Sequence, residues 1–248
     1  MVEGIKKDFE NHWELSDCDF ASEQKKRMAL SFLKPILKVI NQSDKVISLL
    51  DAGCGDGIHA IVLAENISNI HFKYIGLDIS KKAVEKCKSR IGHDDRFSFK
   101  VMDLEDFEVG ETFDIIISYG VVAYARFPQK VISNIVKHLK PHGKFLLWIY
   151  APSIISRISL QFVRLFTTRV NEKILIKIVD LIVHLMTILP VSSGVNLRNS
   201  SIEQCRETVL VNIRPQVLHL PSQHTLNDWI KNTSLKSIDK NIYMRLDK

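Results

Sequence analysis

The sequence predicts a doubly wound α/β fold, in which helices cover both faces of a largely parallel sheet. Short apolar runs alternate with amphipathic stretches through the first 150 residues. Five runs have the length and composition of buried strands, namely 46–50, 71–77, 97–101, 113–118 and 144–150. A strand–helix alternation of this kind is typical of parallel sheets with right-handed crossovers.

The helices are predicted from apolar side chains that recur at steps of three and four residues. These helices cover residues 22–41, 58–66, 81–90 and 128–139. Ser22 and Ser80 stand where N-caps are expected, and Pro35 predicts a kink in the helix that contains it. The chain before residue 22 is expected to form an irregular arm that carries His12 and Trp13.

After Pro152 the alternation stops. Residues 153–190 are helical in character. Lys177, Asp180 and His184 interrupt their most apolar part, so this segment is not expected to span a membrane. Residues 191–224 are predicted to form a loop. A capping box at Thr225 opens a short helix over 225–232, and 235–246 supply the last two strands.

Charge and cysteine usage narrow the class of protein. The 248 residues carry a net charge of +6, but the basic residues are scattered and form no arm for nucleic acid. The four cysteines form no CxxC pair, so we expect no metal site and no disulfide framework. Free cysteines and the absence of an apolar leader favour a cytoplasmic location.

The chemistry-bearing residues follow the predicted strands, where parallel sheets bind ligands. Residues 51–57 read Asp-Ala-Gly-Cys-Gly-Asp-Gly, and Gly53, Gly55 and Gly57 allow close backbone approach to a ligand beside a helix N-terminus. Carboxylates at the next two strand ends suit the ribose hydroxyls and the adenine amine of a nucleoside. The predicted cofactor-binding residues are Asp51, Gly53, Gly55, Gly57, Asp78, Ile79, Asp103, Leu104 and Tyr119.

This set resembles the class I S-adenosylmethionine-dependent methyltransferases. Residues 51–57 are similar to that family's motif I, 76–78 to its ribose-binding motif, and 101–104 to its adenine-binding motif. The resemblance covers 46–150 and implies S-adenosylmethionine as cofactor. It also implies a Rossmann-like sheet of seven strands with the last strand antiparallel. The loop reads GxGxG, which disfavours a dehydrogenase.

The chain is therefore expected to be a single methyltransferase domain over residues 1–248. Its parts would be a helical arm at 1–45, a cofactor-binding core at 46–150, a helical lid and acceptor region at 151–224, and a final helix with strands at 225–248. The predicted lid is a helical segment inserted between the fifth and sixth strands.

The acceptor is expected to be a small molecule of natural-product, quinone or saccharide type, methylated at oxygen, with nitrogen and carbon as alternatives. Base methylation is disfavoured, because the fourth strand ends in Ser118-Tyr119-Gly120-Val121 and not in an Asn- or Asp-Pro-Pro-aromatic tetrapeptide, so no nucleic-acid partner is expected. A general base for an oxygen acceptor is usually histidine. The loop residues His219 and His224 are the predicted catalytic pair.

Two rival functions keep the same fold. Aminopropyl transfer would need an acidic loop after the fourth strand, and residues 119–126 contain no acid. A non-catalytic cofactor-binding or membrane-surface module would use residues 153–190, where five basic and two acidic residues give a net charge of +3. A basic amphipathic helix of this kind can lie on anionic lipid or form a dimer contact.

Overall fold

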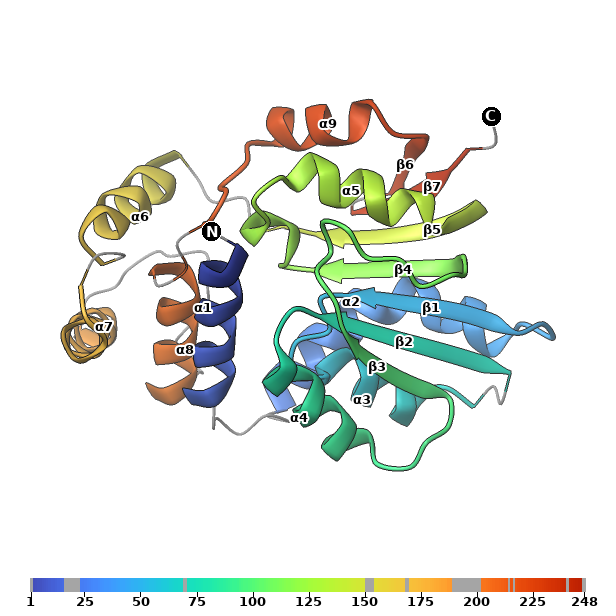
Figure 1. Cartoon of the computed structure of the whole chain (residues 1–248), viewed down its shortest axis with the longest axis horizontal. Helices are drawn as coiled ribbons and strands as arrows, with labels where there is room; N and C mark the ends of the chain where they lie inside the picture. The colour runs from blue at the N-terminus through green and yellow to red at the C-terminus, as the bar shows by residue number, and fades with distance from the viewer. Residues whose placement is uncertain are drawn as a thin grey trace.

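The computed structural model describes the chain over residues 2–15, 23–68, 71–149, 154–167, 170–188, 202–213, 215, 217–239 and 241–246. Its centre is a seven-stranded sheet of order β3-β2-β1-β4-β5-β7-β6 (Figure 1). The strands are β1 Ile47–Ala52, β2 Phe72–Asp78, β3 Phe97–Val101, β4 Phe113–Tyr119, β5 Leu139–Trp148, β6 Leu235–Asp239 and β7 Ile242–Arg245.

The first five strands are parallel, and β7 runs antiparallel to both of its neighbours. This is the Rossmann-like seven-stranded arrangement that the resemblance implied, and that prediction is confirmed. The strand order reverses between β1 and β4. Ligands of open α/β sheets bind in the crevice beyond such a reversal.

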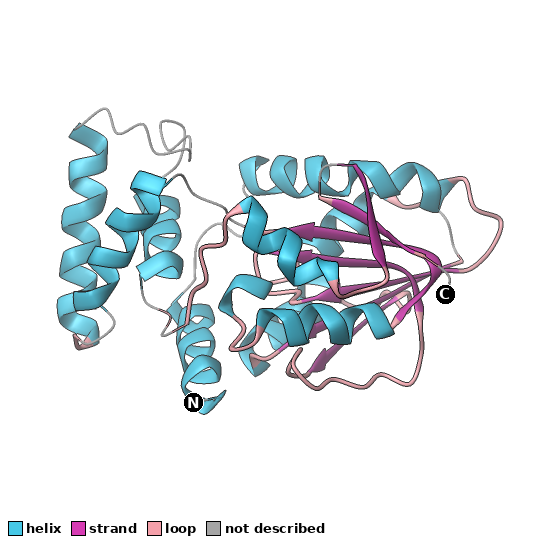
Figure 2. Cartoon of the chain, turned by 90° about the horizontal axis from the view of Figure 1, so that it is seen from above, coloured by secondary structure: helices cyan, strands magenta, loops and turns pink. Residues whose placement is uncertain are grey.

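Strands buried on both faces separate two hydrophobic cores. Leu49 and Ile115 belong to the core covered by α2 (Glu23–Asn41), α3 (Ile58–Asn66) and α4 (Lys81–Ile91). The adjacent Leu50 and Ile116 point to the opposite face, which is covered by α5 (Pro128–Lys137) and α9 (Gln223–Lys231). Successive strand residues face opposite sides, so the apolar runs fill both cores. Figure 2 shows helices on both sides of the sheet.

The predicted helical arm is confirmed, and only the irregular chain expected before residue 22 is corrected. α1 spans Val2–Leu15. Ile5, Phe9, His12 and Trp13 fall on one face of it, because residues spaced by four, three and one overlap on a helix. That face packs on the rest of the protein, and tertiary contact stabilises a helix whose sequence is otherwise polar.

Three further details differ from the prediction. Pro35 does not split α2, which continues past it and fully buries Ile36 and Ile40. β5 begins at Leu139, with an irregularity in the pairing to β4 before Lys144. The cap of α9 is Ser222, whose hydroxyl accepts the Thr225 N–H at 3.1 Å, so the expected cap at Thr225 was wrong by three residues.

A third core lies outside the sheet. α6 (Ile154–Thr167), α7 (Glu172–Ile188) and α8 (Ile202–Ile213) form a cluster at one end of the molecule (Figure 2), here called the α6–α8 bundle. Its core joins α7 to α8 through Leu175, Val179, Val183, Cys205, Val209 and Ile213.

Helix α8 falls within the segment predicted as a loop. Its buried residues Cys205, Val209 and Ile213 recur every four positions, a period that the many polar residues between them obscure. The predicted loop over residues 191–200 lies outside the described residues. Among the helices that the structure describes, none is both long and apolar enough to cross a membrane.

Candidate active site

A cavity of about 260 Å³ opens at the carboxyl ends of the strands, at the reversal of strand order. Its walls come from the loop after β1, the tips of β2 and β4, the chain after β3, and helix α1. It is lined by Ile5, Phe9, His12, Trp13, Gly53, Cys54, Gly55, Asp56, Ile58, His59, Asp78, Ile79, Asp103, Leu104, Glu105, Tyr119, Gly120, Val121, Tyr124, Ala125, Arg126 and Val131.

Gly53 and Gly55 each combine a left-handed backbone with a close neighbouring side chain. Gly53 has φ 94°, and a Cβ there would lie 2.2 Å from the Val121 side chain. Gly55 has φ 52°, and a Cβ there would lie 3.0 Å from the Trp13 ring. The left-handed φ disfavours any side chain at both positions. α3 begins directly after this loop, so its positive N-terminus faces the cavity side of the turn.

Asp78 joins the glycine loop to β2. One carboxylate oxygen accepts the Gly55 N–H and the other the Ser80 N–H, each at 2.9 Å. Burial raises the pKa of this carboxyl to about 6 against the lowering effect of the two hydrogen bonds, and the negative Asp51 and Glu10 raise it further. Asp78 therefore becomes fully ionised only above pH 6.

Cofactor affinity is expected to fall as the pH drops from 7 to 5, because a protonated Asp78 no longer offers two anionic acceptors to ribose hydroxyls. Asp78→Asn should weaken binding at neutral pH by about one to two orders of magnitude, the value of a charge-assisted hydrogen bond. It should also remove the pH dependence near 6. Calorimetric titration of S-adenosylhomocysteine into both proteins measures this. An unchanged pH profile in the variant would assign the titration to another group.

Of the nine predicted cofactor residues, seven line the cavity: Gly53, Gly55, Asp78, Ile79, Asp103, Leu104 and Tyr119. Asp103 follows β3, and one of its carboxylate oxygens accepts the Glu105 N–H at 2.9 Å, which fixes the turn there. Tyr119 stacks on Trp148 with ring centroids 4.4 Å apart. Burial raises the pKa of Tyr119, so its hydroxyl stays protonated at neutral pH.

The other two predicted residues, Asp51 and Gly57, lie outside the cavity lining. Gly57 caps α3 with φ 88°, beside Cys87. Asp51 is fully buried behind the glycine loop. One of its oxygens accepts the Tyr74 hydroxyl at 2.7 Å and lies 3.4 Å from Nδ1 of His59. Asp51 therefore holds a side chain of the wall, His59, in place.

Helix α1 closes the cavity over the glycine loop, a role that the sequence did not predict. Trp13 packs against Gly55, and Phe9 meets the Tyr124 ring edge-on at 5.5 Å. Glu10 fastens the helix to α4: its carboxylate accepts the Lys81 N–H at 2.7 Å and the Ser80 hydroxyl at 3.0 Å. The spacing of Ile5, Phe9, His12 and Trp13 was the available signal.

The structure does not bring the predicted catalytic histidines to the cavity. The His219 ring lies 3.1 Å from the Ala125 carbonyl, and its backbone N–H donates to the Ala123 carbonyl, so it braces the wall from behind. His224 lies on α9 with its side chain 88% exposed, paired with Asp228 at 3.0 Å.

Tyr124 and Arg164 connect the cavity to the α6–α8 bundle. Burial raises the pKa of Tyr124 to about 12, although the charge of Arg164 opposes the shift. Tyr124 is therefore a neutral hydroxyl in the cavity wall. Arg164 donates to the Asn212 carbonyl at 2.8 Å and to the Pro215 carbonyl at 2.7 Å. These bonds join α6 to α8 and to the chain that follows α8.

Comparison with known proteins identifies a methyltransferase domain in this chain. Residues 43–157 match a family model described as a methyltransferase domain. Residues 43–157 thus form a methyltransferase domain of the class that uses S-adenosylmethionine as its cofactor. The matched residues hold the five parallel strands and all of the predicted cofactor residues.

Two similar curated proteins are named as O-methyltransferases. The chain is 28% identical over 148 residues to the mitochondrial ubiquinone biosynthesis O-methyltransferase of Candida albicans, covering 57% of this chain and 42% of that protein. It is 27% identical over 107 residues to a malonyl-[acyl-carrier protein] O-methyltransferase of Ilyobacter polytropus, covering 43% and 40%. The chain thus spans about two fifths of the length of these relatives.

Among solved structures, the N-methyltransferase NodS from Bradyrhizobium japonicum with S-adenosylhomocysteine has a TM-score of 0.45 and 22% identity. The alignment covers 58% of this chain and 72% of that chain.

Proposed function

We propose that the protein transfers the methyl group of S-adenosylmethionine to an oxygen atom of a small molecule. The observation that carries the proposal is the joint placement of the glycine loop, Asp78 and Asp103 around one cavity at the strand reversal. The names of the two O-methyltransferase relatives support oxygen as the acceptor atom. Within that proposal, residues 1–248 act as one methyltransferase domain.

The residues fit the cofactor in chemistry as well as in place. Backbone amides of the glycine loop and the N-terminus of α3 suit its carboxylate. Asp78 is the acceptor for the ribose hydroxyls, and Asp103 for the adenine amine. Ile79 and Leu104, at the tips of β2 and β3, offer apolar surface to the base between them. The bound sulfonium supplies an already activated methyl group.

The protein then has three tasks at the reacting end of the cavity. It holds the acceptor in line with the methyl group, which alone can supply a large part of the rate. It excludes water through Phe9, Trp13 and the stacked Tyr119. It accepts the proton of the acceptor hydroxyl. For that last task the structure offers a ring nitrogen of His12, which lines the cavity and stacks edge-on against Trp13 at 4.7 Å.

The test is a methyl-transfer assay with radiolabelled cofactor on a panel of oxygen acceptors. The panel contains quinols with and without an alkyl tail, and a malonyl thioester, because the relatives' names refer to ubiquinone and to a malonyl carrier protein. We expect saturable binding of S-adenosylhomocysteine and label in at least one oxygen acceptor. Binding without any transfer, also to amine acceptors, would favour the non-catalytic alternative. No binding would contradict the site itself.

A further inference from the structure

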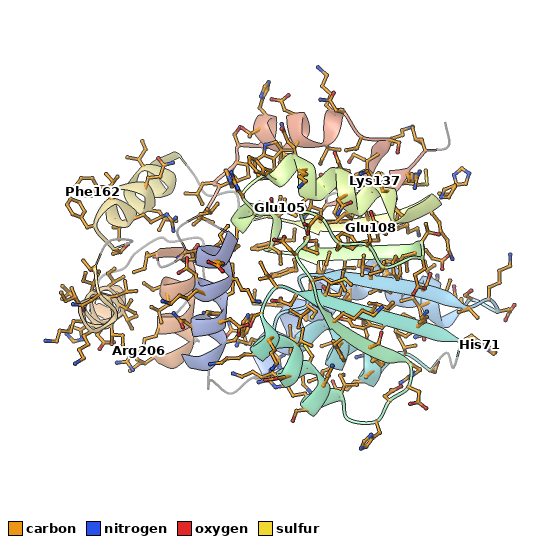
Figure 3. The ribbon with its side chains drawn as sticks, in the orientation of Figure 1. His71, Glu105, Glu108, Lys137, Phe162 and Arg206 are labelled. Atoms are coloured by element: carbon orange, nitrogen blue, oxygen red, sulfur yellow. The ribbon has the colours of Figure 1, made fainter. Side chains whose placement is uncertain are left out.

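The outer face of helix α6 is apolar and turned away from the protein. Ile158, Phe162, Leu165 and Phe166 are 62%, 63%, 57% and 59% exposed. Their spacing of four, three and one residues places all four on a single helical face. The Phe162 and Phe166 rings also contact each other edge-on at 5.4 Å. Figure 3 shows Phe162 projecting from α6 away from the rest of the molecule.

This outer face plays no part in holding α6. The opposite face of the helix packs Leu160 and Val163 on the core of the α6–α8 bundle. On that side Arg164 binds two backbone carbonyls, and the Thr167 hydroxyl donates to the Ile213 carbonyl at 3.0 Å. A cluster of exposed large apolar side chains on an element that is already anchored is typical of an interaction surface.

Basic residues are in excess in the segment that carries the apolar face. Residues 154–188 contain five basic and two acidic residues, of which Arg164 faces the bundle core. On α7, exposed Lys173 and Lys177 stand one turn apart on the solvent side, next to exposed Ile174 and Leu181. The acidic Asp180 is paired with Arg206 at 2.7 Å. Apolar side chains flanked by unbalanced positive charge are the chemistry of a helix that lies on anionic lipid.

We propose that the outer face of the α6–α8 bundle binds peripherally to an anionic lipid membrane. Phe162 and Phe166 would enter the headgroup region, while Lys173 and Lys177 would contact lipid phosphates. A second copy of the chain fits this face less well. A symmetric dimer would bring these lysines close to their own copies, and each chain already carries a net charge of +6.

The proposal is independent of the reaction, so its test uses no activity measurement. The full-length protein is sedimented with vesicles of phosphatidylcholine alone and with an equal mixture of phosphatidylcholine and phosphatidylglycerol. We expect binding to the mixed vesicles that weakens with added salt, and far weaker binding to the neutral ones. Each basic residue near an anionic surface adds about 1 kcal/mol, so Lys173→Glu with Lys177→Glu should lower the partition coefficient by at least tenfold.

Matched variants separate the two contributions. Phe162→Ser with Phe166→Ser should lower binding to the mixed vesicles by at least tenfold. Val46→Ser with Ile238→Ser should not, since these apolar residues are 60% and 46% exposed on other parts of the protein. Lys231→Glu with Lys236→Glu is the control for charge, since both lysines are exposed on other elements. Circular dichroism establishes that each variant is folded.

Two outcomes would overturn the proposal. One is mixed-vesicle binding that is absent, or is unchanged in the Phe162 and Phe166 double variant. The other is a dimer in light scattering that dissociates in that same variant, which would assign the face to contact between copies.

Discussion

Gly55→Val is expected to lower the affinity for S-adenosylhomocysteine by at least 100-fold. The Gly55 N–H donates to Asp78, and its Cα faces the Trp13 ring, so a branched side chain there meets the ring at about 3.0 Å. The ring must move or the loop must rotate. Either change separates the carboxylate from the loop and places a side chain where the cofactor is expected to lie. Losing one charge-assisted hydrogen bond costs ~1.5–3 kcal/mol, and the steric effect adds to it.

Gly110→Val is the matched control for backbone strain. Gly110 has φ 74°, yet an added Cβ meets nothing within 4 Å, and the residue lies away from the cavity. Forcing a side chain into a left-handed conformation costs about 1–3 kcal/mol. Both variants should therefore melt several degrees lower. Only Gly55→Val should lose binding in calorimetry. Equal affinity in the two variants would remove the glycine loop from the cofactor site.

The cofactor half of the site was predictable because its signals are local. Each of Gly55, Asp78 and Asp103 follows a short apolar run. The carboxyl ends of parallel strands lie at the same edge of the sheet, so these residues were expected to lie close together. The buried strands of both cores were predictable for the same reason, since Leu49 and Leu50 belong to a run that has no polar face. Asp51 shows the limit of this reasoning. It occupies a motif position, but its burial behind His59 depends on Tyr74 from the neighbouring strand.

The acceptor half was not predictable, because it depends on packing between distant segments. Glu10 fastens α1 at the cavity by capping α4, a contact across 71 residues with Lys81. The spacing of Phe9 and His12 shows which residues share a helix face, but it does not show what that face covers. His219 and His224 were chosen from their loop setting near Pro221. The structure instead uses one of them to brace the Ala125 carbonyl and leaves the other in solvent.

These placements move the expected catalytic base to His12. Replacing His12 by Ala should lower turnover by about 100-fold, the lower end of what general acid–base catalysis contributes. Cofactor affinity should change little, because Trp13 and not His12 covers Gly55. His12→Asn keeps a polar group of similar size and should be as slow as the alanine variant if proton transfer matters. A fast asparagine variant would indicate that His12 only shapes the cavity.

His224→Ala is the matched control, since its side chain is 88% exposed and lies outside the cavity lining. We expect wild-type turnover from it. His219→Ala should lower thermal stability and loosen the wall at Ala125, with a larger effect on the acceptor KM than on kcat, because its ring binds a backbone carbonyl and not the cavity. The measurement is steady-state kinetics on the best oxygen acceptor from the panel. Loss of turnover in His224→Ala, with activity retained in His12→Ala, would assign the general base to His224 on α9. It would also contradict the proposed role of α1 in the reaction.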